Sequence, residues 1–294
     1  MRVNPNPLPD LLEALNQTQL EAQQAELQIS TGRSVNQPSD NPTAAAQLVE
    51  NNDQATFTSG YLQSVSAVQG QLSTADSTLS SFTTALQQAL SLGVEAGGGT
   101  LNTGDLQAIA TQLQAIQTQL VSLANTSDQG KYLFAGTDTN TAPFVLGISP
   151  SGVNYVGNTG VNRVTIGSGY SLAVNVPGSQ LFTPPGNDIF LAVNNLIQAV
   201  ETNTGIPSAV NAVSAASSYF SAQRAFYGSA LQQLSSQTSY LNTAKLQLSQ
   251  QQNNLGGADL AAAASNLTQS QTDTQAALAA ISKLTQNTLF DYIK

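Results

Sequence analysis

The sequence predicts a mainly α-helical protein with a small β-rich insertion, an α+β fold in which long helices from both ends of the chain form one elongated bundle. Long stretches before and after the middle repeat apolar residues every three or four positions, which is typical of amphipathic helices. The segment from Gly130 to about Phe182 is instead rich in Gly, Val, Thr and Asn, with short alternating runs that indicate strands and turns.

The first helix is expected to begin near Asp10, because Pro5, Pro7 and Pro9 precede it. Its apolar seam follows a spacing of four and three residues and is large at its ends but small or polar inside. The seam consists of Leu11, Leu15, Thr18, Ala22, Ala25 and Ile29. Any amphipathic helix of a bundle would show this pattern, so the seam alone does not identify a function.

A loop rich in turn-forming residues follows this helix. Gly32 suits the left-handed conformation that ends many helices, and Arg33 lies near the negative end of the helix dipole. After Pro38, any of Ser39, Asp40 and Asn41 can cap a second helix whose first turn contains Pro42. The residues Gly32–Pro42 therefore predict a connection between two helices.

Four further helices are predicted before the C-terminal one. They span about 42–96, 105–125, a stretch of about 14 residues from Asp188, and 207–255. The first carries a seam that consists of Tyr61, Val65, Val68, Leu72, Ala75, Leu79, Phe82, Leu86 and Ala89. The short link around Gly97–Gly99 makes the helices at 42–96 and 105–125 antiparallel neighbours.

The C-terminal stretch, residues 256–294, predicts a long helix with a narrow stripe. After Gly257 it contains no Gly or Pro, and the middle of its stripe is small or polar. The large apolar side chains are Leu260, Leu267, Leu278, Ile281, Leu284, Leu289, Phe290 and Ile293. Isolated helices are marginally stable in water, so this helix is expected to need packing partners.

The composition excludes several classes of protein. The chain has 294 residues, a net charge of −9 and no Lys or Arg between Arg33 and Lys131, so it cannot neutralise a row of phosphates in nucleic acid. It has no run of 18 apolar residues that could span a membrane. Its N-terminus has no apolar secretory signal, which predicts either cytoplasmic residence or export by a route that reads no such signal.

The sequence offers no candidate catalytic, cofactor-binding or metal-binding residues. It contains neither His nor Cys, so the usual triads and thiolate sites are impossible. The acidic residues are scattered singly, and Gly97–Gly99 lacks the Gly-Lys-Ser/Thr that would complete a phosphate loop. We therefore predict a protein that is not an enzyme and has no cofactor.

Three separated segments resemble one protein family. Ser30–Ala46 reads STGRSVNQPSDNPTAAA and resembles the signature after the first helix of bacterial flagellins and flagellar junction proteins. Lys131–Phe144 reads KYLFAGTDTNTAPF and is similar to the start of the β-rich region in the hook-associated protein 3 family. Leu278–Lys294 reads LAAISKLTQNTLFDYIK and is similar to that family's C-terminus.

The resemblance implies a structural, secreted subunit at the extracellular junction of flagellar hook and filament, exported by the type III apparatus. It implies a flagellin-like bundle whose terminal helices assemble and whose β domain faces outward. The implied partners are other copies in a ring, a neighbouring hook-associated protein, filament-side subunits and an export chaperone. The implied interface consists of Leu11, Leu15, Ile29, Leu267, Leu278, Ile281, Leu284, Leu289 and Phe290, with a junction loop at Gly32, Arg33, Pro38, Asp40 and Pro42.

We accordingly divide the chain into five parts. They are an N-terminal assembly helix and loop (1–45), two bundle segments (46–129 and 187–255), a β-rich outward domain (130–186) and a C-terminal assembly helix (256–294). Two alternatives remain at this point. One is a filament-forming flagellin, which would polymerise alone, and the other is a coiled-coil module such as an adhesin stalk, which would form a stable parallel oligomer.

Overall fold

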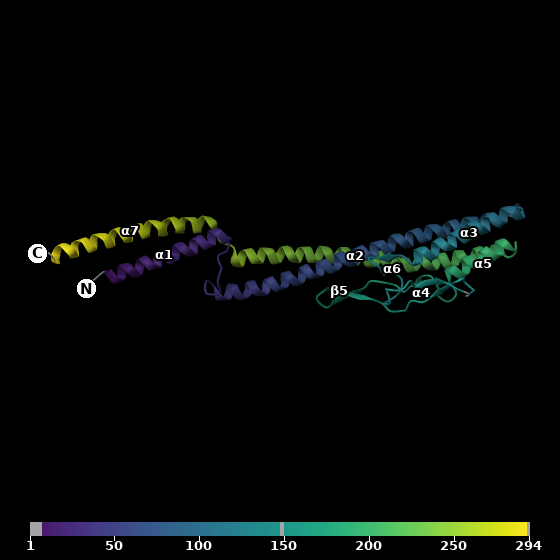
Figure 1. Ribbon diagram of the computed structural model, residues 1–294, viewed down its shortest axis with the longest axis horizontal. Helices are drawn as coiled ribbons and strands as arrows, with labels where there is room; N and C mark the ends of the chain where they lie inside the picture. The colour runs from purple at the N-terminus through teal and green to yellow at the C-terminus, as the bar shows by residue number, and fades with distance from the viewer. Residues whose placement is uncertain (1–7, 148–149, 293–294) are drawn as a thin grey trace. The chain divides into compact units, whose positions relative to one another are not determined.

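The computed structural model describes residues 8–147 and 150–292, and the side-chain surroundings of these residues except Leu8 and 284–292. The chain divides into two compact units. One, the terminal unit, consists of Met1–Phe57 and Thr243–Lys294, and the other, the central unit, is Thr58–Asn242. The boundaries between the units fall within the two longest helices, Pro42–Ala96 and Ile206–Gly256 (Figure 1). The five parts proposed from the sequence are divisions by function and remain predictions.

The helices confirm the predicted fold class. In chain order they are α1 (Leu8–Thr31), α2 (Pro42–Ala96), α3 (Thr103–Ala124), α4 (Gly178–Leu181), α5 (Ile189–Glu201), α6 (Ile206–Gly256) and α7 (Leu260–Tyr292). The short helix α4 was not predicted. Helix α1 begins at Leu8 rather than near Asp10, so Pro9 lies inside its first turn. A proline is tolerated there because the first N–H groups of a helix have no acceptor within the helix.

Polar side chains fix several of these helix starts. The Asn41 side chain accepts a hydrogen bond from the N–H of Ala44 at 3.0 Å, so Asn41 caps α2. At α3, Asn102 and Asp105 form a reciprocal capping box. Asp188 caps α5 by accepting from the N–H of Leu191 at 2.9 Å. These contacts satisfy N–H groups that would otherwise lack partners.

The β-rich insertion consists of separate antiparallel hairpins in the described residues. Strand β1 (Ser127–Asp128) pairs with β2 (Lys131–Tyr132), β3 (Phe144–Leu146) with β4 (Val153–Tyr155), and β5 (Arg163–Gly167) with β6 (Tyr170–Ala173). Two-stranded hairpins are marginally stable alone, so side chains outside the strands must hold them in place.

Polar and aromatic side chains supply that support. The side chain of Asn125, just after α3, both accepts from the N–H of Phe144 and donates to its carbonyl, at 2.9 and 2.7 Å. Gln237 of α6 donates to the carbonyl of Ile166 at 2.9 Å, and Tyr170 donates to Gln233 at 3.0 Å. The hairpins are thus tied to the neighbouring helices at several separate points.

The core of the central unit is dominated by phenylalanine. Phe82 of α2 packs against Phe182, Phe190 and Phe220, with ring centroids 4.8, 6.4 and 4.8 Å away. Phe134 and Phe144 of the insertion join the same cluster through Phe182. All six rings are fully or almost fully buried, and the predicted α2 seam from Val65 to Ala89 is buried with them. This cluster joins the insertion to α2, α5 and α6.

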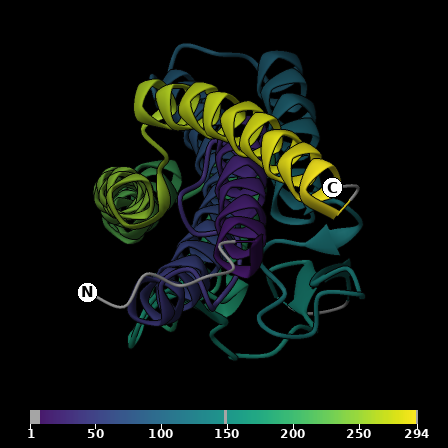
Figure 2. The same ribbon diagram turned by 90° about the vertical axis from the view of Figure 1, so that its left-hand side faces the viewer.

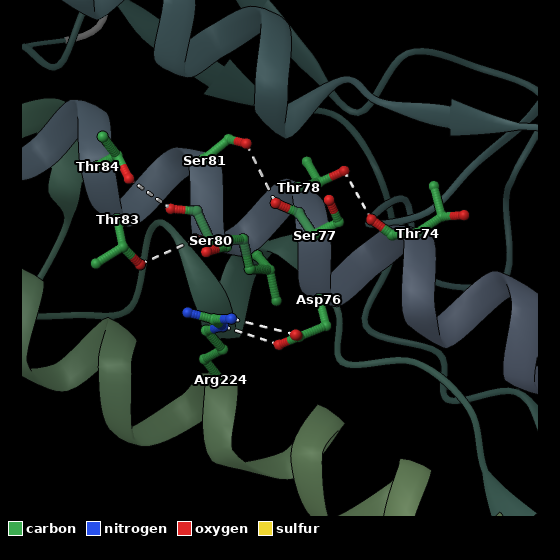
Figure 3. A network of polar contacts seen from close by, with 10 residues as sticks. Thr74, Asp76, Ser77, Thr78, Ser80, Ser81, Thr83, Thr84 and Arg224 are labelled. Carbon is green, nitrogen blue, oxygen red and sulfur yellow. Dashed lines mark hydrogen bonds and ion pairs between the residues drawn. The ribbon is translucent and has the colours of Figure 1, made fainter.

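Helices α2 and α6 also share an ion pair in the central unit (Figure 3). The guanidinium of Arg224 contacts both carboxylate oxygens of Asp76, at 2.8 and 3.1 Å. This interaction raises the pKa of Arg224. Ser and Thr hydroxyls along the same part of α2 donate to carbonyls one turn earlier, for example Thr78 to Thr74 at 2.9 Å.

Candidate assembly surface

The terminal unit is built around a short antiparallel bridge that joins distant parts of the chain. Gly32 ends α1 in the left-handed conformation, with φ of 68°. Its carbonyl accepts from the N–H of Ala258 at 3.0 Å, and the N–H of Ser34 donates to the carbonyl of Gly256 at 2.8 Å. Arg33 thus stands opposite Gly257. The two connections, from α1 to the loop and from α6 to α7, are fastened together at this point.

From this bridge α1 and α7 run side by side as an antiparallel pair (Figures 1 and 2). The residues buried most deeply between them are small: Ala25, Ala263 and Ser270. Further along, the hydroxyls of Thr18 and Thr274 lie 3.4 Å apart. Small side chains let two helix backbones approach closely, but they remove little apolar area from water.

The large side chains predicted for an assembly interface are only partly covered within the chain. Leu11, Leu15, Leu267 and Ile281 are half-buried in the pair, whereas Ile29 and Leu278 are exposed, Leu278 by 51%. The side chains of Leu284, Leu289 and Phe290 lie outside the described residues, although the backbone of α7 continues past them. The role of all nine residues as an interface stays a prediction.

The residues predicted for the junction loop are held by local contacts. The carboxylate of Asp40 accepts from the N–H groups of Asn36 and Gln37, both at 2.9 Å, and so closes the turn that contains Pro38. The Asn36 side chain donates to the carbonyl of Arg33 at 2.9 Å. Asp40 therefore shapes the loop, while Asn41 caps the helix that starts at Pro42.

One side of the α1–α7 pair is polar and acidic. Glu21, Gln24 and Gln28 of α1 face Asn266, Gln269 and Asp273 of α7 across a shallow groove of about 290 Å³. Asp273 accepts from Gln269 and Glu21 from Gln17, so both carboxylates have amide partners. Leu12 and Leu278 are exposed elsewhere on the pair.

A buried amide side chain joins α2 to α6 within the terminal unit. Asn51 of α2 is 3% exposed and donates to the carbonyl of Leu248 and to the side chain of Gln251 on α6, at 3.2 Å each. Sequence reasoning missed this contact and the Arg33–Gly257 bridge. A polar residue at an otherwise apolar helix position, as at Asn51, is the signal that could have indicated the first of them.

Within residues 8–147 and 150–292, no group of three or more acidic side chains is arranged to hold a metal ion. No described helix is both long and apolar enough to cross a bilayer. The described surface of the terminal unit carries leucines and amide side chains.

Comparisons with known proteins define the class. The family model of the bacterial flagellin N-terminal helical region matches residues 9–139. The family model of the bacterial flagellin C-terminal helical region matches residues 210–293. The two matches contain all of α7 and all of α1 except Leu8, the helices that form the pair. The chain is therefore a flagellin-like protein.

Within that class the curated relatives share one name. The chain is 34% identical over 189 residues to flagellar hook-associated protein 3 of Salmonella typhimurium, a match that covers 60% of this chain and 58% of that protein. It is 36% identical over 156 residues to flagellar hook-associated protein 3 of Escherichia coli, which covers 53% and 48%. The resemblance to the hook-associated protein 3 family is thus confirmed over about half the length of these relatives.

Solved structures agree on the fold. FlgL from Bacillus cereus superposes with a TM-score of 0.61 at 20% identity, covering 69% of this chain and 99% of that one. The flagellar junction protein FlgL from Legionella pneumophila superposes with a TM-score of 0.62 at 16% identity, covering 72% and 100%. These names are those of flagellar components rather than of enzymes.

Proposed function

We propose that this chain is a structural subunit of the bacterial flagellum that joins hook to filament. The observation that carries the proposal is the pairing of both ends of the chain, in a protein similar to hook-associated protein 3, into a unit that leaves large leucines exposed. A surface of this kind gains stability when further apolar side chains cover it.

The proposed partners are other copies of the chain in a ring, a neighbouring hook-associated protein and filament-side subunits. An export chaperone would bind before assembly, and the finished protein would lie outside the cell. The proposed contact residues are those predicted from the seams of α1 and α7, Leu284, Leu289 and Phe290 included. The half-covered state of Leu11, Leu15, Leu267 and Ile281 supports this assignment.

The test uses cells that lack the gene and therefore bear hooks without filaments. Purified, gold-labelled protein is added to these hooks, and electron microscopy locates the label. We expect gold as a single narrow band at each hook tip, and filament growth when filament subunits are then supplied. Label along whole filaments would identify a flagellin instead. No label on the hooks would contradict both roles.

An Ile281→Asp variant tests the contact residues in the same assay. In an assembled joint the carboxylate would be desolvated without a partner, which costs several kcal/mol or shifts its pKa. We expect the variant to fold but to leave the hook tips unlabelled. Binding equal to that of the wild type would remove Ile281 from the interface.

A further inference from the structure

Helix α1 has a second apolar face, turned away from α7. Leu20 and Leu27 are 56% and 44% exposed and, seven residues apart, lie on the same side of the helix. Each follows by two residues a side chain that faces α7, Thr18 and Ala25 respectively. Two residues correspond to about 200° around a helix, so the leucines point to the opposite side.

The junction loop makes this face concave. Leu20 and Leu27 form the floor of a groove of about 390 Å³, between Gln23 and Gln24 of α1 and the loop residues Asn36 and Gln37. The wall is fixed before anything binds, because Asp40 holds the N–H groups of both loop residues. A floor of leucines with amides along its edges suits the side of an amphipathic helix.

The outer face of α7 carries small side chains at the corresponding positions. Ser265 and Thr272 are exposed, and each follows by two residues a buried residue of the pair, Ala263 and Ser270. Because two residues correspond to about 200° around a helix, Ser265 and Thr272 point away from α1. The leucines therefore project from one outer face of the pair and small side chains line the other.

The antiparallel register of α1 and α7 places the exposed leucines of α1 and the small residues of α7 at the same levels along the axis of the pair. It begins with Arg33 opposite Gly257 and continues to Thr18 beside Thr274. It therefore sets Leu20 level with Thr272 and Leu27 level with Ser265. Two pairs placed side by side in the same orientation would bring the leucines of one onto the small residues of the next.

We propose that the groove on α1 receives helix α7 of a second copy of this chain, with Leu20 and Leu27 seated against Ser265 and Thr272. This contact rests on the proposed function, since it is the one by which neighbouring subunits would join. It uses different faces on the two partners, so it repeats from copy to copy into a ring or a helical row.

Charge favours α7 of the second copy over α1. Helix α1 carries Asp10, Glu13, Glu21 and Glu26 but no Lys or Arg, so two α1 helices side by side would repel each other. Glu13 continues the line of Leu20 and Leu27 seven residues earlier. Lys283, the single cation of α7, lies two residues after Ile281 on the outer face, one helical turn from the level of Glu13. The outer face of α7 thus carries a cation, whereas α1 of the neighbouring copy carries only acidic charges.

The natural chain has no cysteine, so an introduced pair supplies its only thiols. The test variant is Leu20→Cys with Thr272→Cys in the full chain, assembled on hooks and then oxidised. These positions lie on opposite outer faces of one pair, too far apart for a disulfide within a chain. We expect a ladder of multimers on a denaturing gel that a reducing agent collapses to monomer.

The matched control is Thr18→Cys with Thr274→Cys, whose parent hydroxyls lie 3.4 Å apart and whose disulfide closes within one chain. The test variant could be present in labelled joints and still run as a monomer after oxidation, while the control forms its disulfide within one chain. That result would overturn the proposed contact and leave the proposed function unaffected. If the chain is absent from the joints, the proposed function fails. Oxidation of the concentrated purified variant then decides the contact, with a ladder supporting it and monomer refuting it.

Discussion

The central unit and the terminal unit bury different kinds of side chain. The central unit encloses a cluster of six phenylalanines together with leucines and isoleucines from α2, α3, α5 and α6. The terminal unit buries mainly alanines, a serine and an asparagine, and leaves several leucines in contact with water. The difference teaches that the first unit can be stable by itself, whereas the second has an apolar surface that only further contacts can cover.

The largest expected effect tests the central core. Phe82→Ala should reduce the free energy of unfolding of the central unit by about 3–5 kcal/mol, because it leaves a cavity among packed rings. Phe57→Ala on the same helix is the matched control. Phe57 is 66% exposed, so the change should stay within about 0.5 kcal/mol. Chemical denaturation followed by circular dichroism measures both, and equal losses would refute the contrast.

A smaller effect is expected at the start of α5. Asp188→Ala removes the cap from the N–H of Leu191 and should cost about 1 kcal/mol, whereas Asp188→Asn keeps a capping oxygen. Burial raises the pKa of Asp188, so the folded protein binds this proton more tightly than the unfolded chain.

The contribution of Asp188 to stability should therefore fall as the pH rises from its ordinary pKa through the raised one. Urea unfolding at a series of pH values compares the wild type with Asp188→Asn, in which this dependence should vanish. An unchanged pH dependence in the variant would contradict the assignment.

A still smaller effect is expected from the ion pair between α2 and α6. The side chains of Arg224 and Asp76 are 30% and 33% exposed, and ion pairs in contact with water contribute about 0–1 kcal/mol. A double-mutant cycle with Arg224→Gln and Asp76→Asn should yield a coupling in that range, reduced at high salt. A coupling of several kcal/mol would mean that the central unit depends on this pair as well as on its aromatic core.

The smallest effect on stability should accompany the largest effect on assembly. Leu20→Asp with Leu27→Asp alters exposed side chains of the terminal unit, so the thermal unfolding midpoint of the free chain should hardly change. Binding to hooks should nevertheless be lost, because the carboxylates would be buried in the proposed contact. Val94→Asp, at an exposed apolar position of the central unit, should change neither property. A marked loss of stability in the double variant would show that the leucines already pack within the chain.

The sequence predicted those features that depend on local pattern. Periodicity and known preferences at helix ends predicted the seam from Val65 to Ala89, the left-handed Gly32 and the helix start at Asp188. The first turn of α1 was placed two residues late, because the prolines were given too much weight.

Contacts between distant parts of the chain could not be predicted in this way. The pairing of Arg33 with Gly257 and the hold of Asn51 on α6 join segments far apart in the sequence, and nothing in either segment specifies the other. The exposure of Leu20 and Leu27 is of the same kind, since it depends on which side of α1 faces α7. Local patterns thus determine the helices, and the register between chain ends determines the candidate surface.

The bridge between Arg33 and Gly257 also sets an order of events during folding. It joins residues more than two hundred positions apart, and a loop of that length closes slowly and at an entropic cost that grows with its length. A chain that emerges N-terminus first presents α1 long before α7 exists. The first helix to be made must therefore wait for the last, and the central unit has time to form before the two ends meet.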